Sequence, residues 1–356
     1  MNDKIYQYLT EEQIEEILNK YDDISSYIKD QTFEYKKDTT DLMDDIKYIF
    51  FTYLLLNMGK QMFSSKIQDK MKRYEQDMLN KSDKAYKTIA DLTKYINKGK
   101  YTIDNKTSLK KELKALAEKY KRDFTSTKTE NDKFIRVLNN YYKRTEKTLA
   151  NEWVQANEYL SKKVSEYDKM EKTVAYNRSN AKNGIAYYDI ATYDSMVYNS
   201  NLTRTAILEN IKDAEKQNYD AVYVEPHPYS CELCQEWQGK MYSLTGQSIG
   251  QDVNGYKVKM LLSDCKGLFH PNCSHTFHKV EAENKATNKY SGENWNERYD
   301  AKQKKQSLEL KKQRLLNDNK IYKELGDQAS IDENNQKIKR LREEIKEQKN
   351  IMLGGK

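Results

Sequence analysis

Apolar residues recur three or four positions apart along most of this 356-residue chain, which is the spacing of amphipathic helices. The first predicted helix follows Thr10, which has the form of a capping box with Gln13. The same spacing predicts a helical region over about 41–79, one long helix over 131–172, and a helix or helix pair within 177–208. The apolar stripe of the first helix contains Ile14, Ile17, Leu18, Tyr21, Ile24 and Ile28.

The most hydrophobic run is YIFFTYLLLNM, Tyr48–Met58. Eleven residues are too few to cross a bilayer, so we predict a buried helix, with an amphipathic membrane segment as the alternative. The N-terminal stretch MNDKIYQYLTEEQIEE is charged and lacks the apolar region of a secretory signal. These features predict a soluble protein made in a reducing cytoplasm, where paired cysteines more often bind metal than form disulfides.

The C-terminal part returns to a helix-forming composition over 281–350. Ile338, Leu341, Ile345 and Ile351 predict a helical hairpin or short coiled coil, split near GDQASIDENN, residues 326–335. The alternative is a partly disordered tail. Earlier in the chain, NKGKYTIDNKTS, residues 97–108, is predicted to be a polar connection.

The pattern changes in one internal segment. AVYVEP, residues 221–226, and Met241–Ser243 alternate as short strands do. All three prolines, four histidines and four cysteines of the chain lie between Pro226 and His278. We therefore predict a mainly α fold of long helices, with a small α+β module inserted before a helical C-terminal tail.

This pattern predicts three regions along the chain. They are a helical N-terminal region over 1–175, a core with the Cys/His module (226–278) over 176–280, and a helical hairpin or coiled-coil tail over 281–356.

Composition agrees with long helices rather than one large globular core. Apolar residues make up 37% of the chain and charged residues 33%, so narrow apolar stripes fit better than a wide buried centre. The net charge of +7 arises from 62 basic and 55 acidic residues that are mostly interleaved. This mild bias permits contact with nucleic acid, but it is not the clustered basic face of a dedicated DNA reader.

The cysteines and histidines are spaced as metal ligands. Cys231 and Cys234 form a C-x-x-C pair, and His270-Pro271-Asn272-Cys273-Ser274-His275 follows about forty residues later. Two such ligand pairs around a strand-and-turn region are how small zinc modules are built, and mixed thiolate and imidazole ligands favour tetrahedral zinc. A closed site with four protein ligands predicts a structural metal, because no position remains for a catalytic water.

The candidate metal ligands exceed four. Cys231, Cys234 and Cys273 are the first choice, with His275 or His270 as the fourth ligand, and His227 and Cys265 in reserve. The alternatives are unliganded side chains packed in a small core, or a disulfide. Beside the first pair, Gly239 is predicted to supply a turn and Trp237 to cover the site or fill the core.

At these positions the sequence resembles two related families of tailed bacteriophages. The Mu protein F-like head morphogenesis family shows C-x-x-C, a G-K pair and H-P-x-C-R-C, which here are Cys231–Cys234, Gly239-Lys240 and residues 270–275. The phage minor capsid protein 2 family shows W-Q-G-K-x-Y-S and N-C-R-H-S-F, which here are residues 237–243 and 272–277.

The resemblance covers about residues 175–350, with three departures from the families' pattern. Ser274 stands where arginine is usual, and Ala206 where glutamate is usual. His275 replaces a cysteine of the Mu-type motif and keeps a potential zinc ligand.

The resemblance implies a structural minor head protein of low copy number. It implies a place in the head interior near the portal of the virion, reached from the host cytoplasm, and a role in head assembly, DNA packaging or genome ejection. The implied partners are the portal protein and major capsid or scaffolding proteins, with packaged DNA left open. No enzymatic activity, membrane contact during assembly or small-molecule substrate is expected.

Two other functions are compatible with the same residues. His270, Asn272 and His275 spell the letters of an H-N-H nuclease, although six residues are too few for that strand–loop–helix unit. A zinc-bearing module that binds DNA is the other, and it would require binding that weakens steeply with salt.

Overall fold

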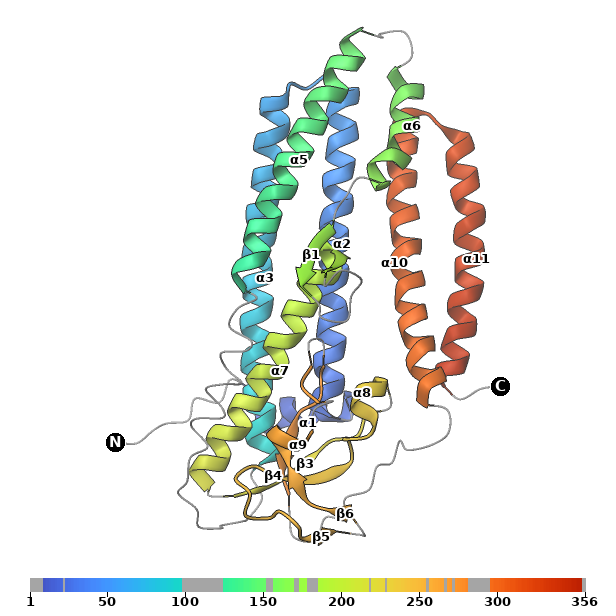
Figure 1. Cartoon of the computed structure of the whole chain (residues 1–356). Helices are drawn as coiled ribbons and strands as arrows, with labels where there is room; N and C mark the ends of the chain where they lie inside the picture. The colour runs from blue at the N-terminus through green and yellow to red at the C-terminus, as the bar shows by residue number, and fades with distance from the viewer. Residues whose placement is uncertain are drawn as a thin grey trace. The chain divides into compact units, whose positions relative to one another are not determined.

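The computed structural model describes residues 9–21, 23–97, 124–151, 156–169, 173–177, 185–217, 219–227, 229–253, 256–265, 268–270, 273–280 and 295–353 (Figure 1). Apart from Asn97, the polar connection predicted at 97–108 lies outside these residues. The chain forms two compact units, each drawn from three segments. Unit 1 contains residues 1–33, 80–123 and 196–299, and unit 2 contains residues 34–79, 124–195 and 300–356.

The fold is mainly helical with a small sheet region, as predicted. Among the described helices, none is long and apolar enough to cross a membrane. The long helices are α1 (Glu11–Lys20), α2 (Ile24–Leu55), α3 (Lys60–Ile96), α5 (Phe124–Asn151), α6 (Ala156–Lys169), α7 (Ile190–Gln217), α10 (Trp295–Leu325) and α11 (Gln328–Met352).

The capping box at the first helix is confirmed. The Thr10 side chain accepts a hydrogen bond from the Gln13 backbone, and the Gln13 side chain accepts one from the Thr10 backbone. The predicted stripe through Ile28 is divided between two helices, however, because the chain is extended at Tyr21. Asp23 then accepts a hydrogen bond from the backbone N–H of Ser26 at 2.5 Å, which caps the first turn of α2. The apolar spacing continues from Ile14 to Ile28, but the extended backbone at Tyr21 and the cap at Asp23 divide it into two helices.

The apolar run Tyr48–Met58 is helical as far as Leu55, and its two phenylalanines are buried in unit 2 as predicted, whereas Leu56 is 62% exposed. Phe50 and Phe51 are 0% and 1% exposed. Tyr142 of α5 packs edge-on against Phe50 and stacks on Phe63 of α3 with ring centroids 4.0 Å apart. The helical region predicted over 41–79 is in fact two helices, since α2 ends at Leu55 and α3 begins at Lys60.

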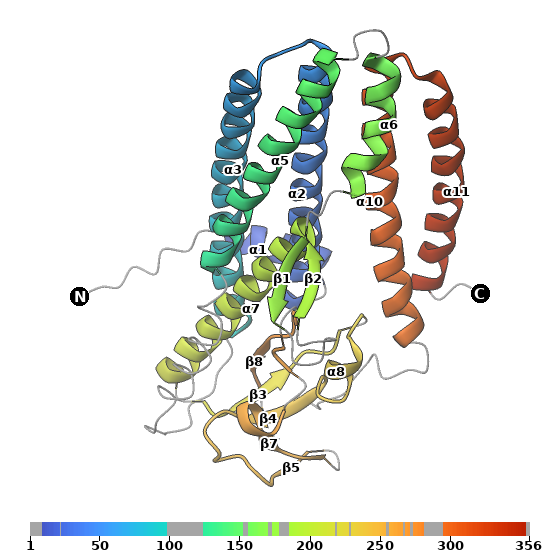
Figure 2. The ribbon, with the colours of Figure 1, turned by 45° about the horizontal axis from the view of Figure 1, so that its top comes forward.

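Two further predictions about helices in unit 2 need correction. The single helix predicted over 131–172 is two helices, α5 and α6, and residues 152–155 lie outside those described. Within 177–208, where a helix or helix pair was predicted, the strand β2 (Ile185–Asp189) precedes α7. It pairs antiparallel with β1 (Thr173–Asn177), with Ala175 opposite Tyr187 (Figure 2). Strands this short give too few alternating positions to be separated from a helical pattern.

The predicted C-terminal hairpin is present in unit 2 and is not a disordered tail. α10 and α11 lie side by side in both views (Figures 1 and 2), and Asn334 donates a hydrogen bond to Asn319 across the pair. The break falls at Gly326 and Asp327, so most of the predicted 326–335 split is already helix α11. Asn334, Ile338, Leu341 and Gln348 form the buried stripe of α11.

Unit 1 contains a four-stranded sheet in the order β7-β4-β3-β8. Its central pair confirms the two predicted strands: Val222 of β3 lies opposite Tyr242 of β4 in antiparallel register. The sheet strands are β3 (Ala221–Val224), β4 (Lys240–Ser243), β7 (Lys259–Met260) and β8 (Phe277–Lys279), with a separate pair β5 (Asp252–Val253) and β6 (Tyr256–Lys257).

The core of unit 1 joins α7 to this sheet. Ile207 and Ile211 of α7 are buried in the same cluster as Val222, Tyr242 and Phe277 of the strands. Three cysteines lie in that cluster too: Cys234, Cys265 and Cys273. The thiols are therefore inside the packed module rather than on its surface.

Candidate metal centre

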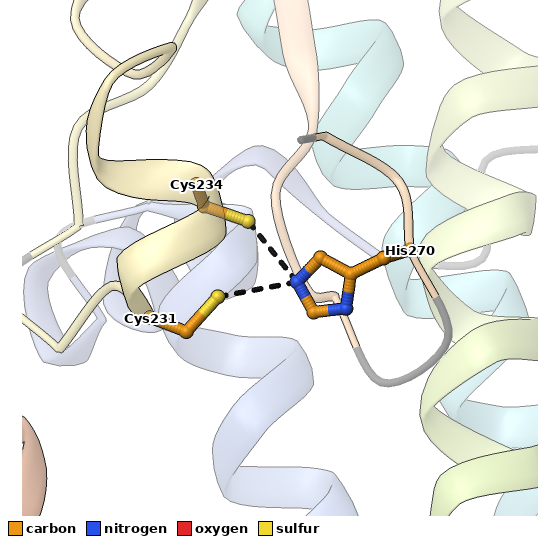
Figure 3. Close-up of side chains that lie close together, drawn as sticks. All are labelled: Cys231, Cys234 and His270. Carbon is orange, nitrogen blue, oxygen red and sulfur yellow. Dashed lines mark hydrogen bonds between the residues drawn. The ribbon is translucent and has the colours of Figure 1, made fainter. Parts of the chain in front are cut away.

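The first cysteine pair is presented by the short helix α8 (Glu232–Gln235). Cys231 is its N-cap residue, and the backbone N–H of Cys234 donates to the Cys231 carbonyl at 3.0 Å. This tight turn places both sulfurs on the side of α8 that faces His270 (Figure 3). Cys231 is half-buried, whereas Cys234 is 1% exposed.

The second half of the centre lies between α9 (Leu261–Asp264) and β8. Phe269 has a φ of +57°, an uncommon conformation for a bulky residue, and it turns the chain immediately before His270. The backbone N–H of Cys273 donates to the His270 carbonyl at 2.9 Å. This strained turn brings the His270 ring to face the first cysteine pair, as Figure 3 shows.

Five side chains converge on the centre in two overlapping groups. Cys231, Cys234 and His270 form one, and Cys234, Cys273 and His275 form the other. Within each group the donor atoms all lie within 4.8 Å of one another, and Cys234 belongs to both. The structure thus brings together every residue of the predicted ligand set.

The separations of the Cys273 sulfur from its two neighbours match the edges of a tetrahedral metal site, and those of the His270 ring are somewhat shorter. The Nε2 atom of His270 lies 3.1 Å from the Cys231 sulfur and 3.3 Å from the Cys234 sulfur (Figure 3). The Cys273 sulfur lies 3.6 Å from the Cys234 sulfur and 3.6 Å from Nδ1 of His275. Zn–S bonds of about 2.3 Å and Zn–N bonds of about 2.0 Å give tetrahedral edges of roughly 3.5–3.8 Å. The residues present therefore fit a metal ion such as zinc.

The electrostatics of the three thiols also favour a cation. Hydrogen bonding with Cys234, helped by His270, lowers the pKa of Cys231 to about 4. Burial opposes the ionisation of Cys273, but hydrogen bonds with Cys234 and His275 hold its pKa well below the usual range. Cys234 lies between these thiolates, and hydrogen bonds to both raise its pKa, so it keeps a proton. A bound cation would displace that proton, as is usual when thiols become metal ligands.

The two reserve ligands lie outside both groups. His227 is 1% exposed and its Nδ1 accepts a hydrogen bond from the Tyr229 backbone at 2.8 Å. The Cys265 sulfur donates to the carbonyl of Met260 at 3.7 Å, and burial raises the pKa of this thiol to about 12. None of the four cysteines is in a disulfide, so the disulfide alternative is not realised.

Polar residues that the sequence did not single out support the centre. The Nδ2 atom of Asn199 and the hydroxyl of Thr203, one turn apart on α7, both donate to the Cys273 carbonyl, at 2.9 and 2.8 Å. Gln238 accepts at its Oε1 atom from the His227 backbone at 2.8 Å and lies 2.9 Å from Nε2 of His275. Gln238 stands in the quoted WQGK motif, but the spacing of Asn199 and Thr203 gives no comparable signal.

Gly239 and Trp237, which follow the first cysteine pair, both contribute to the fold of the module. Gly239 has a φ of +68° and its N–H donates to the Val224 carbonyl at 2.8 Å, so it supplies the predicted turn into β4. Trp237 is half-buried and packs against the core of the module rather than filling it.

The positions of His270 and His275 do not support the H-N-H nuclease hypothesis. His270 and His275 both direct ring nitrogens at cysteine sulfurs, at 3.1 and 3.6 Å. Asn272 lies outside the described residues.

Residues 185–348 match the family model described as phage minor capsid protein 2. The matched segment runs from β2 to α11 and contains the whole candidate metal centre. No curated protein and no solved structure matches the chain.

Proposed function

Because residues 185–348 carry the features of the phage minor capsid protein 2 family, which supports a structural protein of the phage head, we propose a portal-associated role for this chain in the head interior. The observation that carries the proposal is the family match, which covers the motif-bearing module and the C-terminal hairpin together. The same match supports a structural rather than an enzymatic role.

The role includes head assembly, DNA packaging or genome ejection. The partners would be the portal protein and the major capsid or scaffolding proteins, with packaged DNA as an open contact. The protein would be made in the host cytoplasm and retained in the virion, with no membrane contact during assembly and no small-molecule substrate.

Co-purification tests the proposed partner. The full chain is co-expressed with the portal protein of the phage that encodes it, and mature virions are analysed by mass spectrometry. We expect a stable complex with the portal and a low copy number in virions. A chain that binds only the major capsid protein, or that is missing from virions, would contradict the portal-associated role.

We further propose that the Cys/His centre binds structural zinc. Three thiols and two imidazoles that converge within hydrogen-bonding distance, in a module with a small core, support this. Bound zinc would supply crosslinks between α8 and the segment before β8, and those crosslinks would hold the module folded.

Metal analysis of the purified full chain tests this proposal with a matched pair of variants. Cys273 and Cys265 are both 4% exposed, but only Cys273 belongs to a ligand group. We expect one zinc ion per chain in the unmodified protein and in Cys265→Ser, and loss of zinc in Cys273→Ser. Equal zinc content in the two variants, or none in the unmodified protein, would refute the metal proposal.

A further inference from the structure

The centre offers five donor side chains, whereas a tetrahedral zinc site takes four. The two histidines lie near different sulfurs: His270 contacts Cys231 and Cys234, and His275 contacts Cys273. Their surroundings differ in burial, in distance and in hydrogen bonding. These differences assign a separate role to each ring.

Gln238 determines which nitrogen of His275 carries a hydrogen. The backbone N–H of His227 can only donate, so the Gln238 atom 2.8 Å from it is the carbonyl oxygen, Oε1. The other end of the amide, Nε2, donates to Oε1 of Gln235 at 2.7 Å, which agrees with this orientation. Because Oε1 can only accept, Nε2 of His275 at 2.9 Å must be the donor.

A neutral imidazole that carries its hydrogen on Nε2 has its lone pair on Nδ1. In His275 that lone pair faces the Cys273 sulfur, and the ring is 2% exposed. Metal-bound histidines characteristically donate their second N–H to an oxygen acceptor, which is the arrangement of His275 and Gln238. His275 is thus held with the correct atom directed at the thiols.

The two histidines also differ in the distance between the ring nitrogen and the nearest sulfurs. A tetrahedral edge between a sulfur and a nitrogen ligand is about 3.5–3.6 Å, from Zn–S and Zn–N bonds of about 2.3 and 2.0–2.1 Å. The separation of Cys273 and His275 is 3.6 Å, whereas His270 lies 3.1 and 3.3 Å from its two sulfurs. The shorter contacts of His270 suit an N–H donor that is hydrogen-bonded to the Cys231 and Cys234 sulfurs.

We propose that the metal ion is held by the sulfurs of Cys231, Cys234 and Cys273 and by Nδ1 of His275, with Gln238 as the residue that positions His275. His270 then donates its Nε2–H to the thiolates and offsets part of the negative charge that three thiolates bring to one divalent ion. This assignment rests on the proposed zinc centre and specifies its ligands.

The assignment also connects the metal to α7. The Cys273 carbonyl accepts from Asn199 and Thr203, and the Ser274 hydroxyl donates to Asn199 at 3.1 Å. Cys273 and His275, which are both buried, lie on either side of Ser274 in the sequence, and Ser274 is held by Asn199 of α7. Metal bound by them is therefore coupled directly to the packing of the module on α7.

Imidazole ¹⁵N spectra of the ¹⁵N-labelled full chain loaded with Zn²⁺ test the assignment. We expect one histidine with a zinc-bound Nδ1 and a protonated Nε2, and its signal should vanish in His275→Ala. His270→Ala should keep one zinc per chain. A zinc-bound Nε2 that is assigned to His270, or retention of zinc in His275→Ala with loss in His270→Ala, would overturn the ligand assignment and leave the zinc centre standing.

The role of Gln238 is tested by a pair of variants, which also covers the case in which His275→Ala does not fold. Gln238→Leu removes the acceptor, and we expect zinc affinity, measured by competition with a chelator, to fall roughly 10–100-fold. Gln238→Glu restores an acceptor oxygen and should bind zinc within a few-fold of the unmodified protein. Equal affinity of both variants and the unmodified chain would overturn the positioning role, and an unmodified chain without zinc would refute both proposals.

Discussion

Asp220 stabilises the loop that follows β4 in unit 1. Its carboxylate is buried and accepts hydrogen bonds from the Ser243 hydroxyl at 2.7 Å and from the Ser248 backbone at 2.8 Å. The Thr245 backbone N–H and hydroxyl also donate to it, at 2.6 and 2.5 Å. Burial alone would raise the pKa of Asp220, but the hydrogen bonds from Thr245, Ser243 and Ser248 lower it below its usual range.

A lowered pKa gives the stabilisation by Asp220 a defined pH dependence. The contribution is complete above the unfolded pKa of about 3.9 and is lost as the pH falls through the lower folded pKa. Asp220→Asn replaces the accepting carboxylate and should lower the free energy of unfolding by about 1–3 kcal/mol at pH 7. Denaturant titrations of the full chain between pH 3 and 7 would measure this difference, which should shrink toward the acid end. A difference that stays constant with pH would contradict the role of the ionised carboxylate.

Within unit 2, α10 is attached to α2 by buried polar contacts as well as by apolar packing. Lys47 and Asp318 form an ion pair at 2.6 Å, and both side chains are almost fully buried. Asn317 donates to Asp44 at 2.9 Å beside it. A buried ion pair gives modest net stability, but a single remaining charge is costly in a poorly solvated site.

Asp318→Leu should therefore destabilise the protein by about 3–5 kcal/mol, because it removes the carboxylate that forms an ion pair with the buried Lys47 ammonium. The double variant Lys47→Met, Asp318→Leu should recover most of that loss. Thermal and denaturant unfolding of the unmodified chain, Asp318→Leu, Lys47→Met and the double variant form the required comparison. If the double variant were as unstable as the two single changes added together, the charge-pair explanation would be wrong.

The turn between α10 and α11 depends on one glycine. Gly326 has a φ of +71°, and the N–H of Asp327 donates to the Tyr322 carbonyl at 2.9 Å, as in a Schellman helix end. A Cβ at this glycine would meet no atom within 4 Å, so substitution tests backbone conformation alone.

Gly326→Ala should lower the free energy of unfolding by about 1–2 kcal/mol, because an L-residue in the left-handed region is strained. Gly326→Asn, which tolerates this region better, should lie between alanine and glycine in stability. Urea unfolding of the three proteins provides the measurement. Equal stabilities would show that the turn does not depend on the left-handed conformation.

At the scale of the molecule, zinc is expected to stabilise one unit and not the other. All five donor residues belong to unit 1, whereas α10 and α11 from Asp300 onward belong to unit 2. A chelator should increase amide hydrogen exchange in β3, β4 and β8, and leave α11 unchanged.

Hydrogen-exchange mass spectrometry with and without chelator checks this expectation. The Cys273→Ser chain is the control, since it should exchange rapidly in the same strands before any chelator is added. A uniform response across both units would contradict a local role for the metal.

The division of the chain into regions 1–175, 176–280 and 281–356 stays a prediction.

Local features could be read from the sequence because their causes are local. Thr10 and Gln13 lie three residues apart and satisfy each other's backbone groups in any surroundings. The spacing of Cys231 and Cys234 places two sulfurs on one turn, and the apolar spacing around Ile338 marks the buried face of α11. The mainly helical class, the strands β3 and β4 and the C-terminal hairpin followed from such patterns.

Tertiary structure decided what depends on residues distant along the chain. Only the fold brings Asn199 and Thr203 to the Cys273 carbonyl, and only the fold places Gln238 against His275, 37 residues away. The sequence supplied two histidines with equal claims as ligands. The fold gave them different neighbours, because a hydrogen bond selects which ring nitrogen faces the thiols, and spacing along the chain carries no such information.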